Sequence, residues 1–245
     1  MESMQKIDLD NPFQAPVYYE DIVESTMTAI REIEGAGHGT VLAAGFQSAG
    51  RGRIAGRTWL GGQDENVYFS MVLDGKMLPF PVISLSARTG FALAGFLNSE
   101  YGIPARVKWP NDVLVNGKKI SGILLEVKKQ EIVLGCGINC LQTEFAPLRT
   151  EATSVKLESG SEDTPMKLLG KFLPYLHEEF SGNVSLDSRS ALVWNFGIEI
   201  AVKTGHPDSG QLISGKIAGL NEDGSLRLAV GDEITSVYSG EIVIN

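Results

Sequence analysis

The chain has 245 residues, of which 43% are hydrophobic and 21% are charged. This ordinary globular composition excludes collagen-like, low-complexity and largely disordered chains, and the length suffices for one large domain with or without a small one. With 21 basic and 30 acidic side chains the net charge is −9, so we expect no nucleic-acid partner. No run approaches the ~20 apolar residues of a membrane span, and residues 1–12 do not resemble a signal peptide. We therefore expect a cytoplasmic protein without a membrane partner.

The cysteine and histidine content argues against a disulfide or a zinc site. Only Cys136 and Cys140 are present, and in a strand two residues four positions apart lie roughly 13 Å from each other, too far for a disulfide bond. The histidines His38, His177 and His206 are scattered and make no zinc-ligand spacing with the thiols. These residues predict a reduced protein.

The first third of the chain reads mainly as strands. Residues 1–16 are polar and contain proline, so we expect a loose arm. Ser25 and Thr26 offer hydroxyls to cap a helix that runs to about Glu34, where Gly35 and Gly37 stop it. Apolar or alternating runs predict strands at residues 17–23, 40–46 and 66–73.

The middle of the chain combines a helix with a series of strands. Apolar residues at helical spacing, with small residues on one face, predict a helix over residues 81–98 that packs closely on a sheet. Asn116-Gly117 tolerates positive φ at both positions and predicts a tight hairpin. Further helices are expected at residues 164–180, where Pro174 should introduce a kink, and at 187–195. Strands are expected at residues 106–109, 112–115, 120–127 and 131–138.

After Phe196 the pattern changes to five short strand-like runs separated by turns such as Asp223-Gly224 and Gly231-Asp232. This tail predicts a small, independently folded all-β barrel. From Ala191 onward it carries three basic and seven acidic side chains, so its net charge of −4 disfavours a nucleic-acid module.

One motif is rich in arginine and glycine. Residues 46–59, which we call the Arg-Gly loop, contain Arg51, Arg53 and Arg57 and no acidic residue. Glycines allow backbone N–H groups to approach an anion, and guanidinium groups bind carboxylate or phosphate bidentately. The loop fits neither the phosphate-loop pattern nor the dinucleotide fingerprint. A flexible basic surface loop, even one that binds RNA, explains this motif equally well when it is taken alone.

Two further motifs follow in the predicted strands. Residues 107–112 read Val-Lys-Trp-Pro-Asn-Asp, and the hairpin after them is expected to return Lys118 and Lys119 toward the same end of the sheet as Lys108. This clustering of cations in an acidic chain suggests an anionic ligand, although lysines also blunt exposed strand edges. Residues 135–139 read Gly-Cys-Gly-Ile-Asn and close a strand, which alone indicates only tight packing.

Together these motifs resemble the biotin protein ligase family over almost the whole chain. The resemblance rests on Gly-Arg-Gly-Arg…Gly-Arg-x-Trp, Lys-Trp-Pro-Asn-Asp, Lys-x-x-Gly-Ile-Leu-x-Glu from Lys119 to Glu126, and Gly-x-Gly-Ile-Asn, in the family's order. It implies an α+β fold: a mixed-sheet, class II synthetase-like biotin/lipoate ligase catalytic domain over residues 1–195, followed by a small SH3-like β-barrel over residues 196–245. The family's winged-helix domain does not fit before Val17, so we expect a monofunctional bacterial type without a DNA-binding domain.

The resemblance also implies a reaction in two steps. ATP and biotin would give biotinyl-5'-AMP and pyrophosphate, with Mg²⁺ accompanying ATP, and the biotinyl group would then pass to a lysine of a biotin carboxyl carrier domain. The resemblance leaves the oligomeric state open, and a homodimer is among the assemblies it allows. Biotin's ureido ring would be held by Ser25, Thr26, Gln47 and Gly122. The loop residues Gly50, Arg51, Gly52 and Arg53 would close over biotin's carboxylate and the adenylate phosphate.

The remaining roles implied by the resemblance concern the nucleotide and the chemistry. Lys119 would sit between the carboxylate and the α-phosphate. Independently of the resemblance, the positive charges of Lys108 and Arg53 are expected to favour deprotonation of the acceptor lysine. Asp112 would receive that proton, pair with Lys108 or hold Mg²⁺. The nucleotide side would be formed by Arg57, Trp59, Asn111, Asp112 and Asn139.

The motif departs from the family at one place, and two other readings remain. Ile54-Ala55 stands where many family members have a single residue before the glycine, which leaves the roles of Arg53 and Arg57 open. A lipoate- or octanoate-transferring enzyme would share the fold but is expected to have a different loop. A non-enzymatic RNA-binding protein would use the Arg-Gly loop, against which the acidic tail argues.

Overall fold

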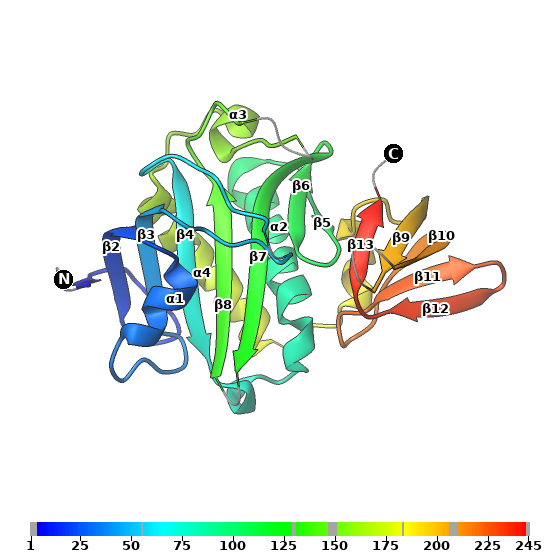
Figure 1. Ribbon diagram of the computed structural model, residues 1–245, viewed down its shortest axis with the longest axis horizontal. Coiled ribbons are helices and arrows are strands. Elements are labelled where there is room, and N and C mark those ends of the chain that lie inside the picture. Colours follow the sequence, from blue (N-terminus) through cyan, green and yellow to red (C-terminus); the bar gives the residue numbers. More distant parts are fainter. Residues whose placement is uncertain are drawn as a thin grey trace.

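The computed structural model describes residues 4–54, 56–128, 131–146, 151–182, 184–205 and 210–243. Its larger part is an eight-stranded sheet in the order β1-β2-β3-β4-β8-β7-β6-β5 (Figure 1). Only β2 and β3 are parallel; every other neighbouring pair is antiparallel, so the sheet is mixed. The strands are β1 Gln5–Ile7, β2 Val17–Val23, β3 Val41–Gln47, β4 Asn66–Leu73, β5 Ala105–Lys108, β6 Asp112–Val115, β7 Lys118–Lys128 and β8 Glu131–Asn139.

Helices cover both faces of this sheet unequally. Two long helices, α2 (Leu85–Tyr101) and α4 (Pro165–Ser181), pack together on one face, where they bury the main core. A Cβ added to Gly90 of α2 would lie 3.2 Å from Val107 of β5, so a glycine there permits the close helix–sheet contact. Among the described residues, the helices on the other face are α1 (Thr26–Ala29) and the following 3₁₀ turn η1 (Ile30–Glu32), which lie beside a small apolar cluster, so no described helix covers the full length of β7 and β8 on that side.

The C-terminal part forms a separate five-stranded antiparallel sheet in the order β12-β11-β10-β9-β13. Its inner face buries apolar side chains such as Val202, Leu228 and Ile242. The strands are β9 Glu199–Thr204, β10 Gln211–Leu220, β11 Leu226–Val230, β12 Glu233–Val237 and β13 Gly240–Val243. The short elements α3 (Val155–Ser159), η2 (Gly75–Met77), η3 (Val82–Ser84) and η4 (Asp187–Leu192) complete the fold.

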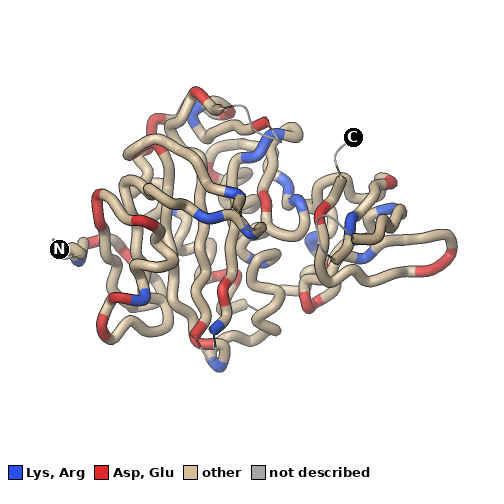
Figure 2. The backbone as a smooth tube through the Cα atoms, viewed as in Figure 1, with Lys and Arg blue, Asp and Glu red and all other residues tan. Residues whose placement is uncertain are grey.

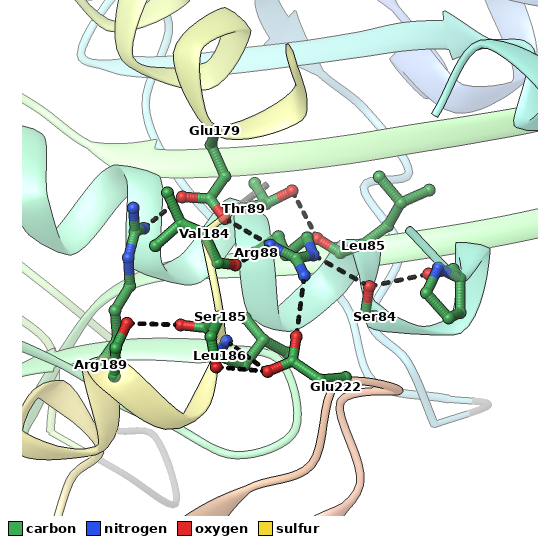
Figure 3. A network of polar contacts seen from close by, with 12 residues as sticks. Ser84, Leu85, Arg88, Thr89, Glu179, Val184, Ser185, Leu186, Arg189 and Glu222 are labelled. Carbon is green, nitrogen blue, oxygen red and sulfur yellow. Dashed lines mark hydrogen bonds and ion pairs between the residues drawn. The ribbon is translucent and has the colours of Figure 1, made fainter. Parts of the chain in front are cut away.

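The turn between β10 and β11 attaches the C-terminal sheet to the larger part. Trp109 donates its indole N–H to the Gly224 carbonyl at 3.0 Å. Arg88 of α2 lies between Glu179 of α4 and Glu222 of the turn, at 3.1 and 3.4 Å (Figure 3). The Arg88 guanidinium also lies 4.2 Å from the centroid of the Phe80 ring. The side chains of Arg88 and Glu179 are each only 2% exposed, so this ion pair is buried at the boundary of the two parts.

Most elements predicted from the sequence are confirmed. The strands at 17–23, 66–73 and 112–115 have the predicted bounds, and five strands follow Phe196. Asn116 and Gly117 both have positive φ, 50° and 82°, as the hairpin requires. α4 begins at Pro165 behind the Thr164 cap and continues through Pro174. The predicted helix at 187–195 is instead the 3₁₀ turn η4.

Two predictions about the N-terminal region are wrong. Residues 4–16 are not a loose arm, because β1 pairs with β2 and Asn11 donates to the carbonyls of Ala15 and Gly39; residues 1–3 of the predicted arm lie outside the described residues. The predicted helix to Glu34 has one α-helical turn before it tightens into η1. The β-branched residues Thr26, Thr28 and Ile30 disfavour a longer helix here.

None of the helices in the described ranges combines the length and hydropathy needed to cross a membrane. Cys136 and Cys140 are both free thiols, and burial raises the pKa of each to about 12.

Candidate active site

The Arg-Gly loop crosses the open face of the sheet, in front of β8 and β7 (Figure 1). It folds back on itself as a short ribbon, in which Trp59 N–H donates to Gly50 O at 3.0 Å and Gly52 N–H donates to Arg57 O at 2.8 Å. A bridge between Arg51 and Thr58 continues this pairing. The loop therefore forms a roof over β7 and β8.

Two paired glycines form the floor under this roof. Gly122 of β7 and Gly137 of β8 are register partners, and the Trp59 ring lies directly against both. A Cβ added to either glycine would lie 2.7 Å from a ring atom of Trp59, so any side chain here would displace the indole. The indole Nε1–H of Trp59, unlike its backbone N–H, is buried and finds no acceptor among the described residues. The floor is thus flat and apolar, with one unpaired donor above it.

A polar cluster closes one end of the floor. The Thr26 N–H and hydroxyl both donate to Gln47 Oε1, at 2.9 and 3.1 Å, and the Ser70 hydroxyl donates to Thr26 Oγ1 at 2.8 Å. Ser25, Thr26 and Ser70 are almost fully buried. The structure thus brings together the predicted residues Ser25, Thr26 and Gln47 and adds Ser70 of β4. These groups can recognise an amide- or urea-like head by complementary hydrogen bonds.

Cations close the other end. Lys119 Nζ lies 2.8 Å from Asp112 Oδ1 and 5.4 Å from the centroid of the Trp59 ring. Lys108 is 6% exposed, with its Nζ 5.9 Å from the ring of Trp194. Burial lowers the pKa of Lys108, and Asp112 partly opposes this shift. This end can hold an anion.

The route by which Lys119 reaches this end differs from the prediction. The hairpin does not return Lys118 and Lys119 to the end of the sheet that holds Lys108, because Lys118 pairs with Val115 whereas Lys108 pairs with Asp112. Instead the Lys119 side chain extends along β7 toward Gly122, and its Nζ lies 3.1 Å from the position that a Cβ on Gly122 would take. Lys118 lies away from the site, 3.8 Å from Glu151.

All three arginines of the loop have partners, two of them on the C-terminal sheet. Arg53 donates to Gly240 O at 2.9 Å, and Arg57 makes two 2.9 Å hydrogen bonds to Glu241. These hydrogen bonds raise the pKa of Arg57 and lower that of Glu241, whereas burial lowers the pKa of Arg53. Basic residues gather where the loop meets β7 and the C-terminal sheet (Figure 2).

Arg51 lies at the opposite end from Lys119. Its guanidinium is 3.0 Å from Glu126, four residues beyond Gly122 on β7. This spacing separates it from the Lys119 ammonium by about 13 Å along the strand. Contact with a ligand carboxylate beside Lys119 would therefore require Arg51 to leave Glu126.

The predicted asparagines hold backbone around the site. Asn111 donates to Ile123 O, and Asn139 donates to the carbonyls of Lys119 and Thr153. They fix the strand that carries Lys119. Ala55 of the Ile54-Ala55 departure lies outside the described residues. Sequence reasoning missed Ser70, Trp194 and Glu241 as site neighbours. Glu126 was part of the motif that begins at Lys119, but no role was predicted for it.

Comparison with known proteins identifies the family. The profile of the biotin/lipoate A/B protein ligase family matches residues 19–141, half of the chain. This chain belongs to that family. The biotin–[acetyl-CoA-carboxylase] ligase of Mycobacterium tuberculosis is 30% identical over 216 residues, which cover 84% of this chain and 79% of that protein. The bifunctional ligase/repressor BirA of Bacillus subtilis is 28% identical over 91% of this chain and 72% of its own length.

Solved structures of the family give the same result. A biotin protein ligase from Aquifex aeolicus in complex with biotin and ATP superimposes with a TM-score of 0.80 at 29% identity, covering 93% of this chain and 97% of that one. The predicted fold class, an α+β ligase domain with a mixed sheet and a small C-terminal β unit, is therefore confirmed.

Proposed function

We propose that this protein is an ATP-dependent biotin protein ligase that activates biotin as biotinyl-5'-AMP and transfers it to a lysine of a biotin carrier domain. The observation that carries the proposal is one continuous glycine floor with a hydrogen-bonding cluster at one end and Lys119 at the other. Such a site matches a ligand with a urea-like head, a flat apolar body and a carboxylate tail. The likeness of the whole chain to a ligase in complex with biotin and ATP supports the same assignment.

In this proposal the polar cluster binds the ureido ring. Thr26 and Gln47 would replace part of their mutual hydrogen bonding with hydrogen bonds to the ring, and Ser25 and Ser70 would support them. The Trp59 ring, which lies against Gly122 and Gly137, would form an apolar wall beside the bicycle, and Gly50 and Gly52 would let the loop lie over the tail. Lys119 would neutralise the repulsion between the carboxylate and the α-phosphate, which is the main barrier to joining two anions.

The nucleotide would lie on the side of the floor where Trp59, Asn111 and Asp112 meet Arg53, Arg57 and Asn139. Mg²⁺ keeps several waters and usually binds through phosphates with one or two carboxylates. Among the described residues, no group of three or more His, Cys, Asp or Glu side chains is arranged to hold a metal ion. This donor set fits a Mg²⁺ ion that ATP brings with it, with Asp112 as the carboxylate available to it and charge neutralisation as its contribution.

Transfer requires a neutral amine on the acceptor lysine, and free lysine titrates near 10.4. Lys108 and Arg53 would disfavour the ammonium form of that lysine by like-charge repulsion, and the Asp112 carboxylate would accept its proton. In the same proposal residues 1–195 form the catalytic domain, residues 196–245 form an SH3-like barrel, and the reaction takes place in the cytoplasm.

The test is incubation of the protein with labelled biotin, ATP, Mg²⁺ and a carrier domain. Covalent label on the carrier, dependent on ATP, is expected. Parallel reactions with lipoate or octanoate test the acyl-chain alternative, and transfer of either in preference to biotin would overturn the proposal. Salt-sensitive RNA binding without ATP turnover would also contradict it.

A further inference from the structure

Glu126 of β7 is the last residue of the motif that begins at Lys119. Its carboxylate lies among three cations. Its Oε1 is 3.0 Å from Arg51 Nη1, its Oε2 is 3.1 Å from Arg31 Nη2, and Lys128 Nζ is 4.0 Å away. The side chains of Glu126 and Arg31 are 21% and 19% exposed and that of Arg51 is 43% exposed, so solvent and salt screen the Arg31 contact less than the Arg51 contact. The carboxylate is thus placed to fix the arginines around it.

Arg31 is itself anchored to the helix that carries the polar cluster. Its Nη1 donates to Met27 O at 2.5 Å, and its Nε donates to Glu131 Oε1 at 2.7 Å. Arg51 approaches the same helix, with Nη2 3.5 Å from Thr28 Oγ1. The Glu126 carboxylate therefore joins three separate elements: α1 with η1, strand β7 and the Arg-Gly loop.

The position of Arg51 determines where the rest of the roof lies. Arg51 and Thr58 form a β-bridge, and the neighbouring Gly50 carbonyl accepts the backbone N–H of Trp59. A shift of Arg51 therefore shifts the indole that lies over Gly122 and Gly137. We propose that Glu126 is a positioning residue, which holds Arg51 so that the loop is seated across the site before the ligand binds. Arg51 then acts through this clamp and not on the ligand's carboxylate.

The inference rests on the proposed function for the identity of the ligand, biotin. A loop that is seated only part of the time lowers the apparent affinity by the seated fraction. Removing the Glu126 charge is therefore expected to raise the KM for biotin about tenfold. The kcat of adenylate formation should stay within about twofold, because the Lys119 ammonium, beside Gly122, lies about 13 Å from Glu126 along the strand.

The experiment compares Glu126→Gln with Glu131→Gln. Glu131 contacts the same Arg31 but not Arg51, so it controls for the loss of a carboxylate beside α1. Unfolding midpoints establish that both variants are folded, and adenylate formation is followed by pyrophosphate release at varied biotin. Only Glu126→Gln should raise the KM. A KM change below about threefold, or a kcat loss as large as the KM change, would overturn the proposal.

A second measurement keeps the two proposals separate. Backbone amide exchange at Trp59, measured without ligand, should be faster in Glu126→Gln than in the wild type or in Glu131→Gln, because a loop that leaves β7 and β8 exposes the Trp59–Gly50 hydrogen bond to water. Equal exchange in all three proteins refutes the clamp. If the wild type forms no adenylate, the proposed function fails, yet the exchange comparison still decides the role of Glu126.

Discussion

Replacing Glu179 with Gln removes one partner of the buried ion pair at the boundary of the two sheets. Glu179 faces Arg88 at 3.1 Å and also contacts Arg189. Removing one member of a buried pair typically costs about 3–5 kcal/mol, because the other charge stays buried. Arg88 would keep Val184 O at 2.9 Å and Glu222 at 3.4 Å, so we expect the lower end, about 3 kcal/mol. For a chain of this size that is a fall in Tm of about 6–12 °C.

The assay is thermal and urea unfolding of three variants. Glu222→Gln removes the exposed partner and should cost less than about 1 kcal/mol. Burial raises the pKa of Glu179 despite its two guanidinium neighbours, so the ionised pair is costly to keep in the interior. The double replacement Arg88→Met with Glu179→Leu should therefore recover most of the single variant's loss. A Glu179→Gln cost below about 1 kcal/mol, or a double variant as unstable as the single, would refute this reasoning.

The other predictions concern the reaction, the thiols and pH. Lys119→Ala should slow adenylate formation on the order of a hundredfold, measured by pyrophosphate release; a rate near that of the wild type would remove Lys119 from the mechanism. Because Asp112 holds Lys119 at 2.8 Å, Asp112→Asn should slow adenylate formation about tenfold. Slower transfer from preformed adenylate alone would instead make Asp112 the proton acceptor. With pKa values of about 12, the thiols of Cys136 and Cys140 should resist alkylation at pH 8 until the protein unfolds; rapid labelling of the native protein would contradict their burial. Burial lowers the pKa of His38, so the folded state binds fewer protons than the unfolded state below pH ~6.5. The urea concentration at the unfolding midpoint should therefore decrease when the pH is lowered from 7.5 to 5.5. The decrease should be smaller in His38→Gln, and an equal decrease in both proteins would contradict this assignment.

Local pattern was sufficient for a strand that is a short, mostly apolar run and for a turn whose residues need positive φ. The strand 66–73, which is almost wholly buried, and the Asn116-Gly117 hairpin are examples, because an apolar run and a positive φ are properties of a few adjacent residues. The short strand β1 has no such signal. It exists because β2 offers an unpaired edge, which only the tertiary structure reveals.

The site shows the same limit. The family motifs brought Thr26, Gln47 and Lys119 into consideration, and the structure places them at the two ends of one floor. The partners of Arg53 and Arg57 lie 187 and 184 positions away in the sequence, on β13. No local pattern encodes contacts of that separation, so the attachment of the loop to the C-terminal sheet could not be predicted.

The placement of the aromatic residues around the site has a practical consequence for spectroscopy. The chain has three tryptophans. Trp59 lies on the glycine floor, Trp109 donates to the β10–β11 turn, and Trp194 faces Lys108. Intrinsic indole emission therefore arises entirely from the ligand site and its border with the C-terminal sheet. Ligand binding and detachment of that sheet can each be followed in the unlabelled wild-type protein, with single Trp→Phe replacements to separate the two signals.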